Sequence, residues 1–344
     1  MPVSELHLAT ARAALREFGL PADARIDFVA HRENHVFRVR ADGVDLALRL
    51  HRPGYRSDEE LRAEVAAMAA FRAAGIAVPD PLPTPAGEDV AVVVDADGTR
   101  RQATALGWFD AAAPMSDSGE VLLGRARPAR IRELGVLAGR LHTVAERIGS
   151  ALAADRPVWD AAGLVGPASL WGSATGSVSL DAHGRAVLAE AESRLGAVLG
   201  ALPRDRHRFG CIHADLTFEN VLEHAGGLAV IDFDDSGPGW YLFDLATTAF
   251  WCAGHPEGQA LVGELFDGYL EHRTLDDTDR AAWEPLLLAR ALSYLGWSAA
   301  RPGDPVSEFH EAELVPRVVA AAERFLDTGG TGWPGPPPAG RMGP

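Results

Sequence analysis

The sequence predicts an α+β protein with a small antiparallel-sheet lobe followed by a larger, mostly helical lobe. Between residues 20 and 108, short runs of apolar and polar residues alternate and are separated by turn-forming residues, as in strands. Beyond residue 130, apolar residues instead recur every three or four positions over long stretches, as in helices that bury one face. We therefore expect the lobes at residues 1–108 and 109–327.

Two helices are expected in the first lobe. Ser4 and Gly19 are suited to begin and end the first helix, because serine caps helix starts and glycine ends helices readily. Ser57 is suited to begin the second helix, which is followed by Gly75, and three acidic residues occupy its first turn, where the helix dipole favours negative charge.

About five strands are expected in the same lobe. The clearest covers residues 44–50, where three leucines alternate with Ala47 and Arg49 and so lie on the opposite face from them. The other expected strands cover residues 26–30, 36–39, 90–94 and 102–108. Antiparallel pairing of these strands would give a small sheet.

The second lobe contains long amphipathic stretches and few strands. Helical stripes cover residues 130–148, 186–202, 257–272, 281–298 and 311–326. Strand-like pieces cover residues 210–213, 221–223 and 228–233. The tail, residues 328–344, holds 11 Gly or Pro among 17 residues, so we expect it to be disordered.

The charge of the chain excludes some partners. It carries 32 basic and 48 acidic residues, a net charge of −16, so the dense basic surface of a nucleic-acid-binding protein is not expected. No run approaches the roughly 20 apolar residues that span a membrane. We expect a cytoplasmic protein with no membrane partner, present as a monomer or a homodimer.

The chain lacks lysine and has few cysteines, and both facts exclude certain reactions and sites. The chain has no lysine, so Schiff-base formation and lysine general bases are excluded. Its two cysteines, Cys211 and Cys252, provide neither a disulfide framework nor a zinc-ligand pattern.

Polar residues suited to metal binding and proton transfer gather in two neighbouring segments. The first reads His213-x-Asp215-x-x-x-x-Asn220, and the second is a short apolar strand that ends at Asp232. A carboxylate at a strand end remains accessible to a metal ion. Since both segments follow short strands, we expect Asp215, Asn220 and Asp232 to lie close together. One carboxylate and one amide oxygen suit Mg²⁺, which completes its coordination with phosphate and water. Asp215 would then accept a proton.

These motifs resemble those of a known family. His213-x-Asp215-x-x-x-x-Asn220, followed by Ile231-Asp232-Phe233, resembles the catalytic and metal motifs of the aminoglycoside phosphotransferase and choline kinase family, a branch of the protein-kinase-like fold. Residues 134–142 and 239–246 resemble two further motifs of that family. Residues 47–56 are most similar to the branch of type II homoserine kinase-like proteins and bacterial stress kinases.

The resemblance implies a bilobal protein-kinase-like fold and a small-molecule kinase. Such an enzyme would move the γ-phosphate of ATP to a hydroxyl of a small molecule, such as an aminoglycoside, a homoserine-like metabolite or another natural product. Asp215 would orient the hydroxyl and accept its proton, with His213 in a structural role beside it. Asn220 and Asp232 would hold Mg²⁺ on the phosphates.

The resemblance also implies where the nucleotide binds. Kinases carry Ala-x-Lys on the third strand, and here the matching residues are Ala47-Leu48-Arg49. Arg49 is expected to contact the phosphates, with Ala47 leaving room for the base. Glu64 lies on the apolar side of its helix, where a carboxylate needs a cation, so we expect it to pair with Arg49.

Three further nucleotide-binding residues are expected from the same resemblance. Leu106 and Trp108 would lie against the adenine at the hinge between the lobes. Asn34 is a candidate in the loop of residues 30–35, which has no glycine and therefore lacks the usual phosphate-cradling backbone.

Three other functions remain open from the sequence. One is a bacterial Ser/Thr protein kinase, although no activation-loop signature follows Asp232. Another is a metallo-phosphoesterase in which His213, Asp215, Asp232 and Asp234 form a two-metal cage. The third is a non-catalytic nucleotide-binding pseudokinase, which the missing lysine makes conceivable.

Overall fold

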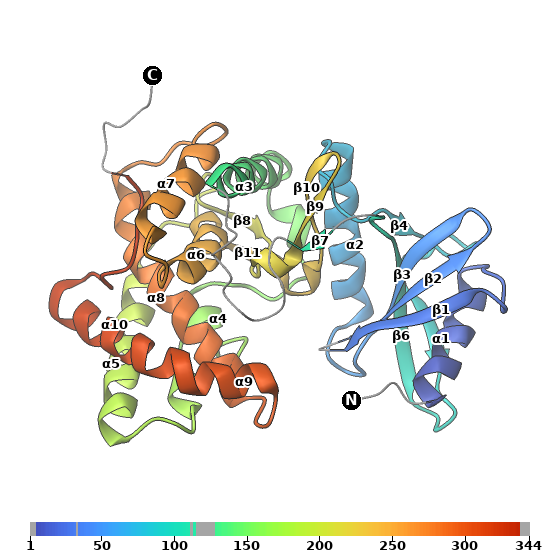
Figure 1. Ribbon diagram of the computed structural model, residues 1–344, viewed down its shortest axis with the longest axis horizontal. Coiled ribbons are helices and arrows are strands. Elements are labelled where there is room, and N and C mark those ends of the chain that lie inside the picture. The colour runs from blue at the N-terminus through green and yellow to red at the C-terminus, as the bar shows by residue number, and fades with distance from the viewer. Residues whose placement is uncertain (1–4, 32–33, 111–112, 115–127, 338–344) are drawn as a thin grey trace. The chain divides into compact units, whose positions relative to one another are not determined.

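The computed structural model describes residues 5–31, 34–110, 113–114 and 128–337 and has the predicted α+β fold (Figure 1). The chain divides into two compact units. The first unit comprises Met1–Ala113 and His224–Ile231, and the second comprises Pro114–Glu223 and Asp232–Pro344. Sequence analysis placed one boundary after residue 108 and did not anticipate that a later segment belongs to the first unit.

The first unit is built on an antiparallel sheet whose strands follow the order β1-β2-β3-β6-β4, with β5 paired to β6. Its helices are α1 (Glu5–Glu17) and α2 (Asp58–Ala73). Its strands are β1 (Arg25–His31), β2 (His35–Ala41), β3 (Val44–Leu50), β4 (Pro81–Leu82), β5 (Ala91–Val94) and β6 (Arg100–Gly107). Each strand expected in this lobe is present, and β4 is an addition.

The core of the first unit lies between α1 and one face of the sheet. As the alternation in β3 predicts, its three leucines point into this core and are buried, together with Phe37 and Val39 of β2. Leu15 and Phe18 pack on them from the α1 side. The opposite face of β3 is therefore left for Ala47 and Arg49.

Helix α2 begins where the sequence predicts. The Ser57 side chain accepts a hydrogen bond from the backbone N–H of Glu60, and the Glu60 side chain accepts one from the backbone N–H of Ser57. This reciprocal capping satisfies two donors that an uncapped helix would leave unpaired.

The second unit is mainly helical. Its helices are α3 (Pro128–Ile148), α4 (Ala161–Leu164), α5 (Ala182–Gly200), α6 (Tyr241–Cys252), α7 (Gly258–Tyr269), α8 (Asp277–Ala299), α9 (Pro305–Phe309) and α10 (Val315–Thr328). One π-helical turn, His310–Leu314, separates α9 from α10. The remaining strands are β7 (Ala113–Pro114), β8 (Phe209–Ile212), β9 (Val221–His224), β10 (Gly227–Val230) and β11 (Gly237–Trp240). Of these, β10 belongs to the first unit, and two boundaries between the units fall within β7 and β9.

Helices α3 and α7 approach each other closely through glycines. A Cβ atom added to Gly135 of α3 would lie 2.0 Å from the carbonyl oxygen of Leu265, and one added to Gly268 of α7 would lie 2.0 Å from that of Arg132. No real side chain fits at such distances, so the absence of Cβ atoms permits this crossing.

Part of the Gly- and Pro-rich tail contacts the rest of the second unit. Residues 329–337 follow α10 and are held by α6, α7 and α8, whereas residues 338–344 lie outside the described residues. Thr331 donates from its backbone N–H and its hydroxyl to Glu284, at 2.7 Å each. The Trp333 ring packs on Phe250 with centroids 5.5 Å apart, and Arg280 donates to the carbonyl of Pro337. These four contacts hold residues 331–337 against the rest of the second unit despite their Gly- and Pro-rich composition.

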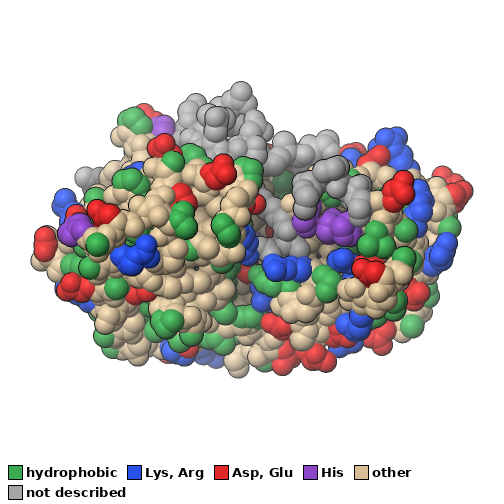
Figure 2. All heavy atoms as spheres, turned by 90° about the horizontal axis from the view of Figure 1, so that it is seen from below, with side chains coloured by type: hydrophobic (Ala, Val, Ile, Leu, Met, Phe, Trp, Pro, Cys, Tyr) green, Lys and Arg blue, Asp and Glu red, His purple; other side chains and the backbone are tan. Residues whose placement is uncertain are grey.

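The structure also shows how the charged side chains and the two cysteines are placed. On the face shown in Figure 2, basic side chains lie scattered among acidic ones and form no single patch. Cys211 and Cys252 are buried and unbonded. Within the described ranges, no helix combines the length and apolarity needed to cross a bilayer.

Candidate active site

The candidate site is centred on the loop that follows β8, a strand paired antiparallel with β11. Ala214 in this loop and Asp232 before residues 233–235 have φ values of 66° and 63°. They are the two non-glycine residues with positive φ in the described part of the chain. Left-handed backbone costs free energy in a residue with a Cβ atom, and such strain gathers at functional sites.

Asp244 braces this loop from inside helix α6. Its carboxylate accepts hydrogen bonds from the backbone N–H groups of His213 (2.9 Å) and Ala214 (2.7 Å) and contacts His142 Nε2 at 3.0 Å. Burial alone would raise the pKa of Asp244, but these hydrogen bonds hold that pKa below its usual value. Asp244 lies in the segment 239–246, whose resemblance to a family motif was noted above. Trp240 is the cap of α6, and Asp244 is the brace.

His213 is buried directly before the predicted proton acceptor. Its Nδ1 accepts a hydrogen bond from the backbone N–H of Asp215 at 3.3 Å, and its ring centroid lies 4.7 Å from that of Phe233. Because Phe233 follows Asp232, this contact places the two predicted motif segments side by side.

Asp215 and Asn220 are joined as the motif predicts. Asn220 Nδ2 donates to Asp215 Oδ2 at 3.0 Å and to the Asp215 carbonyl at 2.9 Å. Since the amide nitrogen is directed at Asp215, the amide oxygen is the atom that can ligate a cation. The Asp215 side chain is 24% exposed, which leaves it accessible to a substrate.

Asp232 is exposed at the start of a loop that Arg156 secures from behind. The buried Arg156 guanidinium donates to the carbonyl oxygens of Ser236 (2.7 Å), Phe233 (3.3 Å) and Asp234. The Asp232 carboxylate and the Asn220 amide oxygen are hard oxygen donors, so the residues present fit Mg²⁺.

The alternative two-metal cage finds no support. Asp234, which that cage requires, is only 5% exposed. Across residues 5–31, 34–110, 113–114 and 128–337, no three His, Cys, Asp or Glu side chains are arranged to hold a metal ion.

Arg290 of helix α8 contacts the site and was missed by the sequence analysis. Its Nη2 donates to Asp215 Oδ1 at 2.7 Å, and the side chain is fully buried. Arg290 interrupts an apolar run of α8, and a lone charge in such a run needs a buried partner. That signal was available in the sequence, but it does not identify the partner.

In the first unit, the predicted ion pair between Arg49 and Glu64 is present. Arg49 Nη1 lies 2.5 Å from Glu64 Oε1, and the two side chains are 7% and 2% exposed. Strand β3 positions Arg49, and the inner face of α2 positions Glu64. A buried pair of this kind fixes both side chains, since separating them would leave an uncompensated charge.

The other predicted nucleotide-binding residues lie in the same unit. Ala47 is directly opposite Leu106 in the β3–β6 pairing, so both lie on the face of the sheet that carries Arg49. The Trp108 ring lies 4.7 Å from the guanidinium carbon of Arg38. Asn34 is buried directly before β2. The nucleotide-binding role of these residues stays a prediction.

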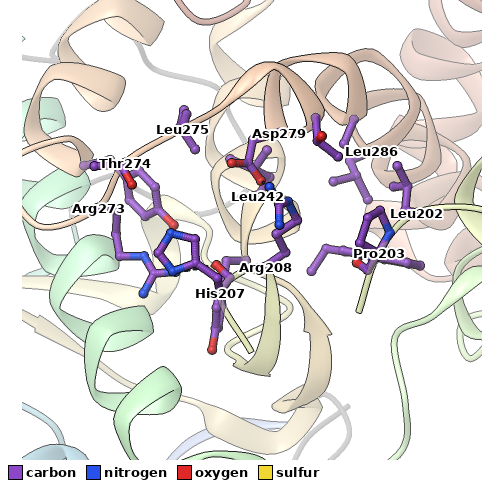
Figure 3. A pocket seen from close by; sticks show the side chains of 15 residues that line it. Leu202, Pro203, His207, Arg208, Leu242, Arg273, Thr274, Leu275, Asp279 and Leu286 are labelled. Atoms are coloured by element: carbon purple, nitrogen blue, oxygen red, sulfur yellow. Dashed lines mark hydrogen bonds and ion pairs between the residues drawn. The ribbon is translucent and has the colours of Figure 1, made fainter. Parts of the chain in front are cut away.

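Figure 3 shows a cavity in the second unit that is separate from the site. It encloses about 20 Å³, space for a water molecule or so, and His207, Arg208 and Arg273 are among its lining residues. None of the residues predicted for catalysis or metal binding lines it.

Comparison with known proteins identifies a family. The family model described as "Phosphotransferase enzyme family" matches residues 26–286. The amicoumacin kinase of Bacillus subtilis (strain 168) is 27% identical over 280 residues, which are 77% of this chain and 76% of that protein.

Two solved structures share the fold. One is a microcompartment-associated aminopropanol kinase, with a TM-score of 0.82 and 26% identity over 94% of this chain and 99% of that chain. The other is an amicoumacin kinase in complex with AMP-PNP, Ca²⁺ and Ami, with a TM-score of 0.70 and 19% identity over 92% of this chain and 93% of that chain.

Proposed function

Because this chain belongs to the phosphotransferase enzyme family, we propose that it transfers the γ-phosphate of ATP to a hydroxyl group of a small molecule. The observation that carries the proposal is the pairing of Asp215 with Asn220 in the strained, braced loop after β8. A carboxylate fixed by hydrogen bonds yet partly exposed is suited to bind a substrate hydroxyl.

The proposed reaction assigns one role to each site residue. Asp215 accepts the hydroxyl proton while the hydroxyl oxygen bonds to the γ-phosphorus and the bond to ADP breaks. Asn220 and Asp232 would hold Mg²⁺, which when bound neutralises charge on the phosphate oxygens. His213 and Asp244 keep the loop backbone in place. Catalysis then comes mainly from positioning and charge stabilisation.

The first unit would bind the nucleotide. Arg49 is assigned to the phosphates because its guanidinium can bind two phosphate oxygens at once, and Glu64 holds it in place. Ala47, Leu106 and Trp108 are assigned to the adenine, and Asn34 to the loop beside it.

For the acceptor, we propose a small alcohol, with amine-bearing alcohols as the first class to test. The names of the relatives support this choice, since one acts on aminopropanol and another on amicoumacin. The net charge of −16 also favours a cationic acceptor over an anionic one. No observation favours a protein substrate, and the pseudokinase alternative is decided by experiment.

The test is an ADP-release screen with Mg-ATP over amino alcohols, hydroxylated metabolites and hydroxyl-bearing antibiotics. We expect acceptor-dependent ADP release and a phosphorylated product detected by mass spectrometry. Asp215→Asn should bind ATP as the wild type does and lose about 10²–10⁴-fold in kcat. Near wild-type kcat in this variant would refute the role of Asp215. ATP binding without transfer to any acceptor would favour the pseudokinase.

A further inference from the structure

Arg290 is a charged side chain in an apolar helix core. It lies in α8, has 0% of its side chain exposed, and is flanked by buried leucine and alanine residues of that helix. An arginine is almost never fully buried unless its charge is paired, because removal from water carries a large free-energy cost. Its position therefore depends on the groups that its guanidinium contacts.

Those groups belong to the catalytic loop. Arg290 Nη2 donates to Asp215 Oδ1 at 2.7 Å, and Nη1 donates to the carbonyl oxygen of Ala214 at 2.9 Å. The two arms of the guanidinium thus hold the carboxylate and the backbone of the preceding residue together. Ala214 has a left-handed backbone conformation. Its carbonyl oxygen accepts a hydrogen bond from Arg290, and its N–H donates one to Asp244, so both sides of this residue are fixed.

Three aromatic rings fix the plane of the guanidinium. Its central carbon lies 4.0 Å from the ring centroid of Tyr294, 4.5 Å from that of Trp171 and 5.5 Å from that of Phe243. Stacking and cation–π attraction favour a planar cation in this position. A lysine offers one point charge without a planar fork, so it would not reproduce both hydrogen bonds and the stacking.

The two oxygens of Asp215 consequently have different partners. Oδ1 accepts from a guanidinium, whereas Oδ2 accepts from the neutral amide of Asn220. A carboxylate oxygen bound to a cation is a poorer proton acceptor than one bound to a neutral donor. Oδ2 also retains a second lone pair after the bond to Asn220.

We propose that Arg290 is a positioning residue for phosphoryl transfer: it fixes the Asp215 carboxylate so that Oδ2 receives the proton of the acceptor hydroxyl. In this step the hydroxyl O–H bond breaks, its oxygen bonds to the γ-phosphorus, the bond from that phosphorus to ADP breaks, and the proton moves to Oδ2. The inference rests on the proposed function, and it adds a residue outside both sequence motifs.

The test measures kcat and KM separately in Arg290→Ala and Arg290→Lys. Because Arg290 acts through Asp215, we expect Arg290→Ala to lower kcat by about 10²-fold with little change in the KM for ATP. Added guanidinium should restore part of the lost kcat by occupying the vacated site. Arg290→Lys should bind ATP normally and show a smaller fall in kcat.

Arg273→Ala is the matched control. Arg273 is also buried, but it pairs with Glu146, donates to the carbonyl oxygen of His207 and lies 4.8 Å from the Tyr241 ring centroid, so its contacts are with groups other than Asp215. We expect this control to lower the melting temperature without a comparable loss of kcat.

Three outcomes would overturn the inference. They are an unchanged kcat in folded Arg290→Lys, a loss of kcat in Arg273→Ala equal to that in Arg290→Ala, or a failure of guanidinium to restore activity to folded Arg290→Ala. A wild-type protein that transfers phosphate to no acceptor would instead refute the proposed function. The two failures are therefore distinguishable.

Discussion

At the scale of single residues, Arg49 is the position most open to direct test. It forms a buried ion pair with Glu64 of α2, and the family resemblance would place a lysine at this position. If Arg49 binds the phosphates, Arg49→Ala should lower kcat/KM. The loss should correspond to about 2–5 kcal/mol of transition-state stabilisation, because the substitution also leaves Glu64 buried without its cation. Arg49→Lys should retain much of the activity. Steady-state kinetics with varied ATP would measure both effects.

Arg101→Ala is the control for that experiment. Arg101 is also largely buried and pairs with Asp95 in the same unit. It has no proposed nucleotide contact, so its removal should affect stability more than the KM for ATP. If both Arg49 variants match the wild type, Arg49 does not touch the nucleotide.

Metal binding gives a second prediction at this scale. Asp232→Ala should abolish the Mg²⁺-dependent tightening of ATP binding, because it removes the carboxylate proposed to bind the ion. Asn220→Ala should weaken that coupling in part. Calorimetric titration of ATP with and without Mg²⁺ measures it, and Glu190→Ala, which alters an exposed acid on α5, should leave it unchanged. Unaltered coupling in Asp232→Ala would show that this carboxylate has no metal role.

At the scale of elements, two of the three glycines of helix α7 lie in opposite surroundings, so their substitution should have opposite effects. A Cβ at Gly268 would lie 2.0 Å from the carbonyl oxygen of Arg132, whereas one at Gly263 would meet nothing within 4 Å. Gly268→Ala should therefore separate α3 from α7 and destabilise the protein by about 1–3 kcal/mol. Gly263→Ala should stabilise it by up to about 1 kcal/mol through helix propensity.

Chemical denaturation of the two variants provides the measurement. Because both substitutions lie in one helix and add the same methyl group, the difference between them isolates the close crossing. Equal free energies of unfolding for the two variants would mean that α3 and α7 can accommodate a Cβ atom at Gly268 without loss of stability.

Elements with a periodic pattern could be predicted, and those without one could not. The leucine alternation of β3 and the cap at Ser57 each determined an element correctly. Helix α6 was missed because it is buried on nearly all sides and shows no apolar stripe. Strand β11 was also missed, because its Pro- and Gly-containing sequence has no strand pattern. It is a strand because it pairs with β8.

The same distinction holds for the site. Motif spacing predicted Asp215, Asn220 and Asp232, because these residues lie close together in the chain. The alternation in β3 and the helix face of Glu64 predicted the pair with Arg49. Arg290 lies far along the chain, and only folding brings it to Asp215. Asp244 lies in the motif of residues 239–246, but its two backbone partners follow from packing.

At the scale of the whole molecule, histidines whose pKa is lowered in the folded protein make stability depend on pH. Burial lowers the pKa of His310 to about 4, and burial together with repulsion from neighbouring histidines does the same for His35. An unfolded histidine has a pKa of about 6.5. Between about pH 6.5 and 4 the unfolded chain therefore binds protons that the folded protein does not, and the free energy of unfolding falls as pH falls.

His310 allows this prediction to be measured. Between pH 7 and 5 its contribution is about 2 kcal/mol, so His310→Gln should lose about that much less stability over the interval than the wild type. Ser298→Ala removes the hydroxyl 2.7 Å from His310 Nδ1 but keeps the histidine, so it should preserve most of the pH dependence. Urea titrations of the wild type and both variants at pH 7 and pH 5 would measure these changes in the free energy of unfolding. An identical loss in His310→Gln and wild type would contradict the prediction.

The division of the first unit between two stretches of chain has a consequence for synthesis on the ribosome. His224–Ile231 contributes to that unit, and the backbone N–H of Val230 donates to the carbonyl of Ala77 at 3.0 Å. The ribosome makes Pro114–Glu223 in between. The amino-terminal part of the protein therefore cannot complete its native contacts as it emerges. The last contacts of the first unit form only after His224–Ile231 has been translated.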